Sequence, residues 1–544
     1  MQALKSNHVL LLVLACISIY FVNLDALYVN IMEARNFITA REMLVDGNWI
    51  LTTLNGEARY QKPPLPTWIT ALSAAIFGLK NLTALRLPAA LMTLILILVS
   101  YSLGFKLTKD KTYAFLGSLI LATSFYVVFA GRNGQWDIFT HAFMMVSIVA
   151  LYQFFSTGKK KYKQILIAAV FFGFSFMSKG PVSMYALLLP FLIAYGIVYK
   201  YKNLKAKALP LILFLVISCI LSLWWHWYTY LMDPVEATRI TTHETSNWTG
   251  YNVRPFYYYW SFFTQSGVWT IPAFIGLLYP YLKNRVIDKK AYLFTFLWTM
   301  ISLLLLSIIP EKKSRYLLPV LIPLALNTAF YIEYLFRKFT ELKDKRETVP
   351  VYFNFGLIAS IGLIFPVAGY FYLKDAITGK WVWFVLLSIA LFAIGWFMIR
   401  NLSRRKIQPV FYLTIAFISA VICFGMPLAK TLTINPEYKG LSQLKEWQDK
   451  NNIEIYEYSY FTPELIWDYG TTIKVLKKNE TIIIPSDEQF GVLVANETIS
   501  AFFKTFEHYS IEKITEYDMN PKGKEDRSHK TRLHRNFYRL TTKN

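Results

Sequence analysis

Repeated apolar runs of about 20 residues constrain this chain more than any other feature. A run of that length crosses the hydrocarbon core of a bilayer as a helix. Charged residues make up only 17% of the 544 residues, against about 25% in soluble domains. The sequence therefore predicts an α-helical polytopic membrane protein with about thirteen spanning helices, at 8–24, 84–105, 111–131, 137–156, 162–178, 181–199, 207–230, 259–281, 291–309, 315–336, 351–373, 380–400 and 409–430. The apolar run 66–79 is too short to span, and we expect it to be re-entrant or interfacial.

The loops between these helices alternate in charge. Those that follow the even-numbered helices hold 24 Lys and Arg residues, whereas the short loops after helices 3, 5, 9 and 11 hold seven. Cytoplasmic loops carry the excess of Lys and Arg, so we expect a cytoplasmic N-terminus and an outer C-terminus. The net charge of +23 then reports topology, which excludes a nucleic-acid partner. The three cysteines lie inside apolar runs with no disulfide or metal spacing.

Three outer segments are too long to be simple connections: 25–83, 231–258 and 431–544. The last one changes to mixed polar composition, with helix-like stretches at 441–450 and 498–507. Between and after them, strand-like stretches occur at 453–458, 481–485, 490–494 and 536–542. We therefore predict a transmembrane domain over 1–430 and an extracytoplasmic α/β domain over 431–544.

The first outer segment begins with a pattern typical of an amphipathic helix over 33–45. Ala34, Phe37 and Ile38 fall on one stripe of that helix, which suits a helix lying at the membrane interface. Arg41 falls within the stripe and needs a buried partner, so we expect an ion pair there.

Lys62 follows in the run Gln61-Lys62-Pro63-Pro64-Leu65-Pro66. Prolines stiffen the chain and prevent a helix from continuing, so they hold Lys62 just outside the bilayer. A lysine in that place can bind a lipid phosphate as a point charge. The alternative is an ordinary interfacial lysine beside a proline-rich turn.

Two more ionisable residues lie at outer helix ends. Asp137 starts a predicted span, where it could be functional or only an N-cap. His141, one turn further on, would give a two-ligand metal pair with Asp137, but a satisfied polar contact explains it better. Lys179-Gly180-Pro181 ends another span; snorkelling or a phosphate contact would each account for this lysine.

The outer loop 310–319 repeats the same combination of cations and prolines. Lys312, Lys313 and Arg315 stand there against the positive-inside trend. Outer cations that face a bilayer favour an anionic lipid partner, although each one alone could be a solvated loop charge. The loop 231–258 is rich in Trp and Tyr, as expected of an interfacial belt, and adds His243, Glu244 and Arg254 as weaker candidates.

Together these motifs resemble the bacterial membrane glycosyltransferases of the GT-C fold, the family of aminoarabinose transferases and protein O-mannosyltransferases. The resemblance covers about residues 1–430 and is most specific in the first loop. The matching elements there are Glu33, Arg35, Arg41-Glu42-Met43-Leu44, Gly47-Asn48-Trp49, Leu54-Asn55-Gly56 and Lys62-Pro63-Pro64-Leu65. Asp137, Lys179-Gly180-Pro181 and Tyr316-Leu317-Leu318-Pro319 follow in the family's order.

The resemblance implies roles for individual residues. Glu33 and Asp137 become the candidate catalytic carboxylates. The donor phosphate would be bound by Arg35, Lys62, Lys179, Lys312, Lys313, Arg315 and Tyr316. Substrate-cavity candidates are Tyr60, Gln61, His243, Glu244 and Arg254. The chain departs from the family at Met32-Glu33, where the family has an Asp-Glu pair, so the identity of the base stays open. Gln61 is often acidic in arabinose transferases, which argues against assuming their donor.

The implied reaction is inverting transfer of a sugar from a polyprenyl-phosphate donor, on the periplasmic side of the bacterial inner membrane. A lipid A-like molecule, a glycan or a protein would be the acceptor, and membrane lipids would surround a monomer. No metal motif is evident, and we expect no cofactor. Two alternatives remain: a transporter or flippase of a lipid-linked glycan, and a non-catalytic glycolipid-binding scaffold.

Overall fold

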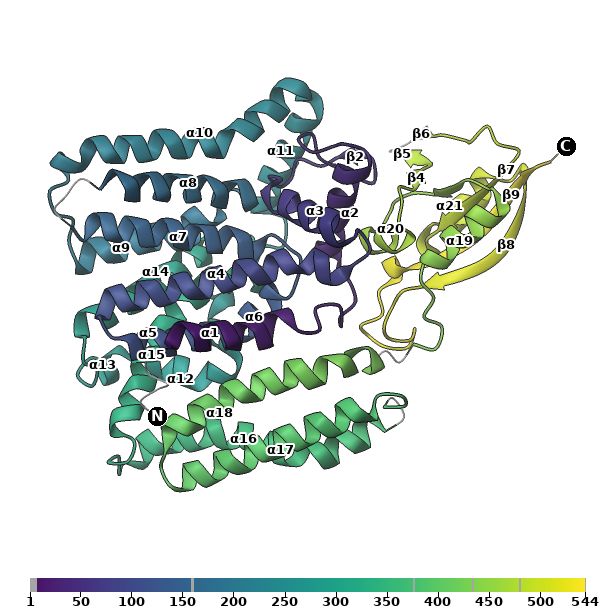
Figure 1. Cartoon of the computed structure of the whole chain (residues 1–544). Coiled ribbons are helices and arrows are strands. Elements are labelled where there is room, and N and C mark those ends of the chain that lie inside the picture. The colour runs from purple at the N-terminus through teal and green to yellow at the C-terminus, as the bar shows by residue number, and fades with distance from the viewer. Residues whose placement is uncertain (1–6, 158–160, 375–376, 433–434, 479–480, 544) are drawn as a thin grey trace. The chain divides into compact units, whose positions relative to one another are not determined.

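The computed structural model describes residues 7–157, 161–374, 377–432, 435–478 and 481–543. The chain forms two compact units (Figure 1). The helical unit comprises Met1–Ala26 and Tyr60–Leu428, and the sheet unit comprises Leu27–Arg59 and Ala429–Asn544. The change of unit between Leu428 and Ala429 falls close to the predicted boundary at 430. The assignment of Leu27–Arg59 to the sheet unit differs from the prediction, which placed the whole first outer segment in the transmembrane domain.

The helical unit is built of long helices that pack side by side (Figure 1). Its α-helices are α1 (His8–Cys16), α3 (Leu65–Phe77), α4 (Leu82–Thr108), α5 (Lys111–Thr123), α6 (Phe125–Gly131), α7 (Asp137–Phe155), α8 (Tyr162–Lys179), α9 (Leu189–Val198), α10 (Ala208–Met232), α11 (Pro234–Gly250), α12 (Thr270–Gly276), α13 (Tyr279–Leu282), α14 (Lys289–Ile308), α15 (Leu318–Lys338), α16 (Lys345–Leu373), α17 (Trp381–Ser403) and α18 (Ile407–Ala420). α8 packs against both α7 and α10, and α5 packs against α4 and α15.

Within the described residues, eight helices are long and apolar enough to cross a membrane, or nine if the bent pair α5–α6 is one span. The protein is thus a multi-pass membrane protein, and the predicted thirteen spans exceed this number. Three of the predicted spans correspond to shorter or bent helices, at His8–Phe21, α5–α6 and Met184–Val198. The predicted span 259–281 is a series of short helices, broken at Gly267, where φ is +67°.

Two buried arginines hold the end of the first helix. Arg86 donates to the carbonyl of Leu24 at 2.6 Å, and Arg132 donates to those of Ile19 and Asn23 at 2.6 and 2.8 Å. The last carbonyls of a helix lack partners within the helix. Arg132 supplies such a donor to Ile19, and the two guanidinium groups together tie the end of the first helical segment, His8–Phe21, and the residues after it to α4 and α6.

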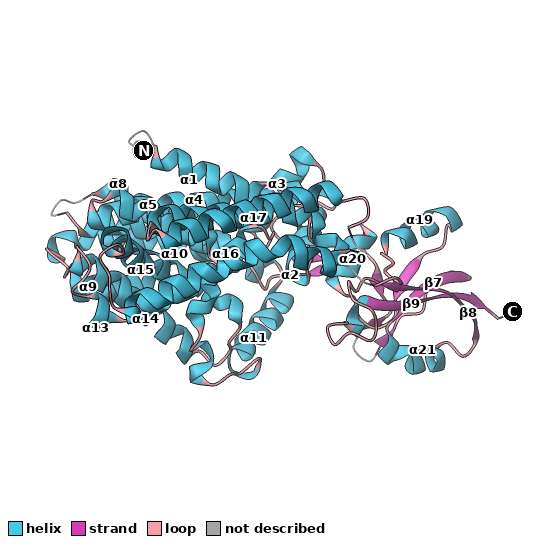
Figure 2. Ribbon diagram, turned by 90° about the horizontal axis from the view of Figure 1, so that it is seen from below, coloured by secondary structure: helices cyan, strands magenta, loops and turns pink. Residues whose placement is uncertain are grey.

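The sheet unit holds every strand of the described residues (Figure 2). A short hairpin pairs β1 (Thr53–Leu54) with β2 (Glu57–Ala58), and another pairs β5 (Lys477–Lys478) with β6 (Thr481–Ile482). The main sheet has the order β4-β3-β7-β9-β8. Its strands are β3 (Ile455–Glu457), β4 (Lys474–Val475), β7 (Gln489–Val494), β8 (Tyr509–Asp518) and β9 (His534–Thr542), and the flanking helices are α19 (Ser442–Asn451), α20 (Pro463–Tyr469) and α21 (Ile499–Thr505). β3 is parallel to β4 and β7, whereas β9 is antiparallel to β7 and β8.

A buried ion pair links two strands of this sheet. Arg535 of β9 donates from Nε to Glu457 of β3 at 3.0 Å, and both side chains are buried. Burial raises the pKa of Glu457 to about 7, against the opposing effect of Arg535. A buried charge needs such a partner, so the pair fixes the two strands across β7.

The first-loop helix α2 (Ile31–Val45) also belongs to the sheet unit. Its predicted apolar stripe is buried, but protein covers it. Ile38 packs with Leu465 and Ile466 of α20, and the Phe37 ring meets that of Trp467 edge-on at 5.3 Å. The interfacial interpretation of this face was therefore wrong.

The expected ion pair of Arg41 is also wrong. Its Nη1 donates to the carbonyl of Ile466 at 3.3 Å, and its buried Nη2 has no hydrogen-bond partner among the described residues. Burial lowers the pKa of this arginine. A backbone carbonyl replaces the predicted carboxylate because α20 presents its backbone to this side of α2.

Candidate catalytic site at the helix ends

Asp137 and Lys179 form a buried ion pair between two helices. α7 begins at Asp137 and α8 ends at Lys179, and Gly180 leaves the helix with φ of +73°, in the left-handed region that favours glycine. The two side chains are only 3% and 7% exposed. The N-cap of α7 is Trp136, so an N-cap role for Asp137 is excluded. Its Oδ2 is buried and has no hydrogen-bond partner among the described residues.

His141 has a conventional polar partner. Its Nδ1 lies 2.9 Å from the hydroxyl oxygen of Ser183, and both side chains are buried. This confirms the polar contact expected from the sequence. Among the described residues, no group of three or more His, Cys, Asp or Glu side chains could hold a metal ion.

Tyr316 gathers several charged side chains around its ring. The Lys179 and Lys313 amines lie 5.4 and 5.6 Å from its centroid, and the Arg315 guanidinium lies 5.8 Å away. Its hydroxyl donates to Glu311 at 2.9 Å, and Lys313 pairs with the same carboxylate at 2.5 Å. We call Asp137, Lys179, Glu311, Lys313, Arg315 and Tyr316 the Tyr316 cluster. It brings together three of the cationic candidates, one catalytic candidate and the tyrosine of the Y-x-L-P element.

Arg315 completes the charge pattern of the cluster. Its charge interacts with those of both Asp137 and Lys179. Its Nε is buried and, like Asp137 Oδ2, has no hydrogen-bond partner within the described chain. Buried polar groups in native structures are nearly always hydrogen-bonded. An unpartnered donor and an unpartnered acceptor in one cluster therefore indicate a place for a ligand with both kinds of group.

Lys62 is held by α11. Its amine is 3.4 Å from Glu244, and its charge interacts with that of Lys179. Tyr60 donates to Asp233 at 2.9 Å. Burial, with the hydrogen bond to Asp233 next in effect, raises the pKa of Tyr60 and keeps its hydroxyl protonated. The two bonds join the start of the proline-rich turn to the N-cap of α11 and to a residue within that helix.

Four other candidates lie in less suitable places. The Lys312 amine donates to the carbonyls of Arg254 and Ile309 at 3.1 and 2.5 Å, and burial lowers its pKa. Its donors are thus used to hold the loop together. Arg254 and Gln61 are exposed, and His243 is an exposed neighbour of Asn247 on α11. The structure does not bring these side chains into the Tyr316 cluster.

Glu33 and Arg35 belong to α2 of the sheet unit. Glu33 is buried and forms a capping box with Asn30, whose amide donates to Glu33 Oε2 at 2.9 Å. The carbonyl of Arg35 accepts a bond from Arg59 at 3.2 Å. Glu33 therefore has a structural role at the start of α2, in addition to any chemical one.

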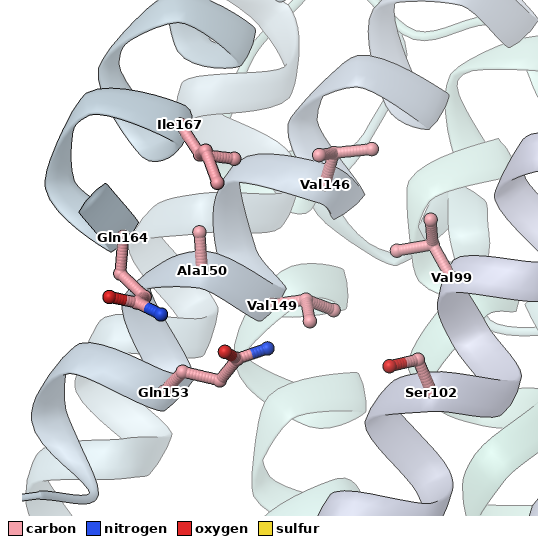
Figure 3. Close-up of a pocket in the computed structure, with 8 residues that line it drawn as sticks. All are labelled: Val99, Ser102, Val146, Val149, Ala150, Gln153, Gln164 and Ile167. Carbon is pink, nitrogen blue, oxygen red and sulfur yellow. The ribbon is translucent and has the colours of Figure 1, made fainter.

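A cavity of about 180 Å³ between α4, α7 and α8 lies away from this cluster (Figure 3). Gln153, Gln164 and Ser102 are its polar members, and the rest of its lining is apolar. Gln153 is sixteen residues beyond Asp137 on α7, or about 24 Å at 1.5 Å per residue. None of the predicted site residues lines it.

Comparison with known proteins agrees with this arrangement. The family model of dolichyl-phosphate-mannose-protein mannosyltransferases matches residues 61–227, a segment with Lys62, Asp137 and Lys179. A protein of Aquifex aeolicus is 28% identical over 59% of this chain and 63% of its own length. The undecaprenyl phosphate-alpha-4-amino-4-deoxy-L-arabinose arabinosyl transferase of Serratia proteamaculans is 25% identical over 75% of this chain and 73% of its own length. The chain thus spans less than two thirds of the Aquifex relative.

Solved structures show the same fold. The crystal structure of ArnT from Cupriavidus metallidurans bound to undecaprenyl phosphate superposes with a TM-score of 0.70 at 15% identity, covering 98% of this chain and 97% of that one. The chain therefore shares this fold, and its sequence resembles those of aminoarabinose and protein mannosyl transferases. The resemblance inferred from the sequence is confirmed.

The structure explains two of the first-loop motifs that carry this resemblance. Glu42, of the R-E-M-L element, accepts bonds from the Thr53 hydroxyl at 2.5 Å and from the Asn55 amide nitrogen at 2.7 Å. Asn55, of the L-N-G element, bonds both the carbonyl and the N–H of Ile473 at 2.8 and 2.9 Å. The two side chains thus fix the β1–β2 hairpin and join it to the C-terminal part of the sheet unit.

Sequence reasoning missed several members of the site. Glu311 lies in the loop that was singled out for its cations, and it neutralises part of their charge. Asp233 anchors Tyr60, and the charges of Asp137 and Arg315 both reach Tyr126. The acidic residue between Pro310 and Lys312 was the available signal for a counter-ion. Asp233 and Tyr126 approach their partners through tertiary packing, so no local sequence pattern indicated them.

Removing one member of the Asp137–Lys179 pair should destabilise the protein strongly. We expect Lys179→Met or Asp137→Asn to cost about 3–5 kcal/mol, because each leaves an uncompensated buried group. The double variant should lose less than the sum, since neither charge is then unpaired. Thermal unfolding of the four proteins in detergent measures this, with Lys338→Met and Glu341→Gln, an exposed pair at 2.7 Å, as the matched control. Additive effects of the two buried substitutions would contradict the pairing.

Asn55→Gly should loosen the sheet unit while sparing the backbone. Asn55 has φ of +57°, which glycine adopts freely, so only the side-chain bonds to Ile473 are lost. Each unsatisfied buried group costs about 1–3 kcal/mol. Hydrogen exchange at the Ile473 amide should become faster. Asn452→Gly is the control, because Asn452 has φ of +52° and lies exposed. Equal exchange rates of the Ile473 amide in both variants would contradict a stabilising role of the Asn55–Ile473 bonds.

Proposed function

We propose that the chain transfers a sugar, with inversion at the anomeric carbon, from an undecaprenyl-phosphate-linked donor to a lipid acceptor. The observation that carries the proposal is the Tyr316 cluster, in which Asp137 Oδ2 and Arg315 Nε are buried and have no hydrogen-bond partner among the described residues. The resemblance to GT-C transferases and the donor named for the Serratia relative support it. The arabinosyl and mannosyl transferases among the relatives favour a pentose or a hexose as the sugar.

The leaving group determines what the site must supply. Departure of a polyprenyl phosphate breaks the bond between the anomeric carbon and the phosphate oxygen and leaves a phosphate monoester. The second pKa of such a group is about 6, so near neutral pH it leaves without a general acid. Cations fixed where negative charge develops then lower the barrier.

Arg315 and Lys62 are the proposed phosphate contacts. Arg315 has an unpartnered buried donor, and Lys62 is half-buried and held by a single 3.4 Å bond that an incoming phosphate can replace. Glu311 and Asp137 already balance Lys313 and Lys179. Lys312 is left out of the contact set, because its amine binds backbone carbonyls. Arg35 stays a proposed contact on the family motif alone.

Asp137 is the proposed base for a hydroxyl acceptor. The acceptor oxygen attacks the anomeric carbon as its proton passes to Asp137 Oδ2, and the electron pair of the broken bond remains on the phosphate. If the acceptor is an ionised phosphate, no proton moves and the carboxylate orients the acceptor. Glu33 is the second proposed carboxylate, although its capping box gives it a structural duty.

The site is proposed to lie on the periplasmic side of the bacterial inner membrane. Loop charges support a cytoplasmic N-terminus and an outer C-terminus. All members of the Tyr316 cluster come from one chain, so a monomer suffices.

Reporter fusions test this orientation. A fusion at Asn203 should be active only with a cytoplasmic reporter, and a fusion at Gly523 only with a periplasmic one, because the charge bias places the two loops on opposite sides. Fusions with the same reporter response at both places would overturn the proposed topology.

Transfer assays test the chemistry with radiolabelled undecaprenyl-phosphate sugar and extracted lipid acceptors. Asp137→Asn should lower turnover by about 10²–10⁴-fold, the usual contribution of a general base. Lys62→Ala should raise KM for the donor by about tenfold or more, since a charge-assisted contact is worth about 1.5–3 kcal/mol. Glu33→Gln should lower turnover if this carboxylate takes part in the reaction.

Lys338→Met is the control for effects of detergent and expression, because this exposed lysine pairs with Glu341 alone among the described residues. Wild-type turnover in both carboxylate variants would sink the assignment of the base. Donor movement across vesicles without any covalent product would favour a transporter, whose substrate leaves unchanged.

A further inference from the structure

A second cavity of about 300 Å³ opens at the far end of α15. It is formed by the last residues of that helix and by the turn between α17 and α18. α15 begins two residues after Tyr316, and the cavity lies near Phe339. The twenty or so residues between them measure about 30 Å along a helix. This cavity is therefore separate from the candidate catalytic site.

The floor of the cavity is apolar. Leu335, Phe339 and Ile407 are buried beneath it, and Phe336 and Pro409 complete its wall. Aromatic and aliphatic side chains at the end of a spanning helix suit the upper part of an acyl chain. A free inorganic ion would form no favourable contact with these apolar side chains.

The rim of the cavity is cationic. Arg405 donates from Nη1 to the carbonyl of Leu342 at 2.7 Å, which fixes its guanidinium. The Lys406 amine is exposed and forms no ion pair or hydrogen bond within the described residues. By contrast, Arg337 and Lys338 nearby are paired with Glu333 and Glu341. Unlike these neighbours on α15, the rim residues Arg405 and Lys406 have no carboxylate partner among the described residues.

The start of α18 adds a second reason for an anion. Lys406 is the N-cap of this fourteen-residue helix, and no side chain caps it. The first N–H groups of a helix are unsatisfied and carry positive partial charge. A cation at that position is unfavourable alone, whereas a phosphate would satisfy both the helix end and the lysine.

We propose that this cavity binds an anionic phospholipid, with its phosphate between Arg405 and Lys406 and an acyl chain over Phe336 and Pro409. The depth fits, because α17 ends at Ser403 and α18 begins at Ile407, so the turn lies where lipid headgroups lie. Basic pockets between spanning helices recognise such headgroups. The site is separate from the transfer reaction and does not depend on the proposed function.

The test is thermal unfolding of the purified full-length protein, delipidated in neutral detergent and titrated with dioleoylphosphatidylglycerol or dioleoylphosphatidylcholine. Lipid that binds the folded state raises Tm with concentration. We expect phosphatidylglycerol to raise Tm at concentrations at which phosphatidylcholine does not. Lys406→Glu should weaken the phosphatidylglycerol effect by about 5- to 10-fold, as expected for a cation close to an anionic headgroup.

Lys406→Glu breaks no contact within the described chain, so loss of folding will not obscure its effect. Arg405→Ala should weaken the effect similarly. Lys202→Glu makes the same charge change in an exposed loop and should leave the titration unchanged. A wild-type response of Lys406→Glu, or equal responses to the two lipids, would overturn the proposal.

Discussion

The buried pair of Asp137 and Lys179 is the interaction on which the arrangement of the candidate site depends. Two charges that are 3% and 7% exposed remain ionised only because each compensates the other, since an isolated buried charge costs several kcal/mol. The pair joins the first residue of α7 to the last residue of α8. It therefore sets the register of these two helices, against which α10 and α4 pack.

The same pair also sets the electrostatics of the site. Because Asp137 neutralises Lys179, the positive charge left for a phosphate comes from Arg315 and Lys62. The Arg315 guanidinium lies 5.8 Å from the centroid of the Tyr316 ring, and the face of an aromatic ring attracts a cation at modest cost in desolvation. Lys62 is instead held by Glu244 at 3.4 Å. The candidate site thus contains two balanced pairs, Lys179 with Asp137 and Lys313 with Glu311, beside Arg315 and Lys62.

Much of this arrangement was predictable from the sequence, for definite physical reasons. Long apolar runs fixed α4, α7, α10 and α14 to α18, because a bilayer imposes length and composition on a helix. Prolines and loop cations drew attention to Lys62, Lys179 and Arg315, and the structure places the last two in the Tyr316 cluster. The number of spans was overestimated where packing inside the unit, rather than lipid, requires apolar residues, as in 259–281. β8 was missed because Tyr509–Asp518 has mostly half-exposed or exposed side chains, so its alternation carries little hydrophobic signal.

The first loop shows why a specific motif can be recognised before its role is understood. Glu33, Glu42 and Asn55 lie in a segment whose resemblance to the family suggests a catalytic role. Each of the three side chains nevertheless forms a hydrogen bond that stabilises the fold. Glu33 caps α2, Glu42 holds the hairpin, and Asn55 clasps Ile473. Ile473 is 418 residues away in sequence, so no local pattern in the first loop could indicate it. The bonds of these three residues fix the conformation of the first loop, so a residue of this motif can be required for the fold as well as for a reaction. The carboxylate most available for chemistry is accordingly the one with an unpartnered oxygen, Asp137, and the first-loop carboxylates are better explained as the groups that shape the segment leading into Lys62.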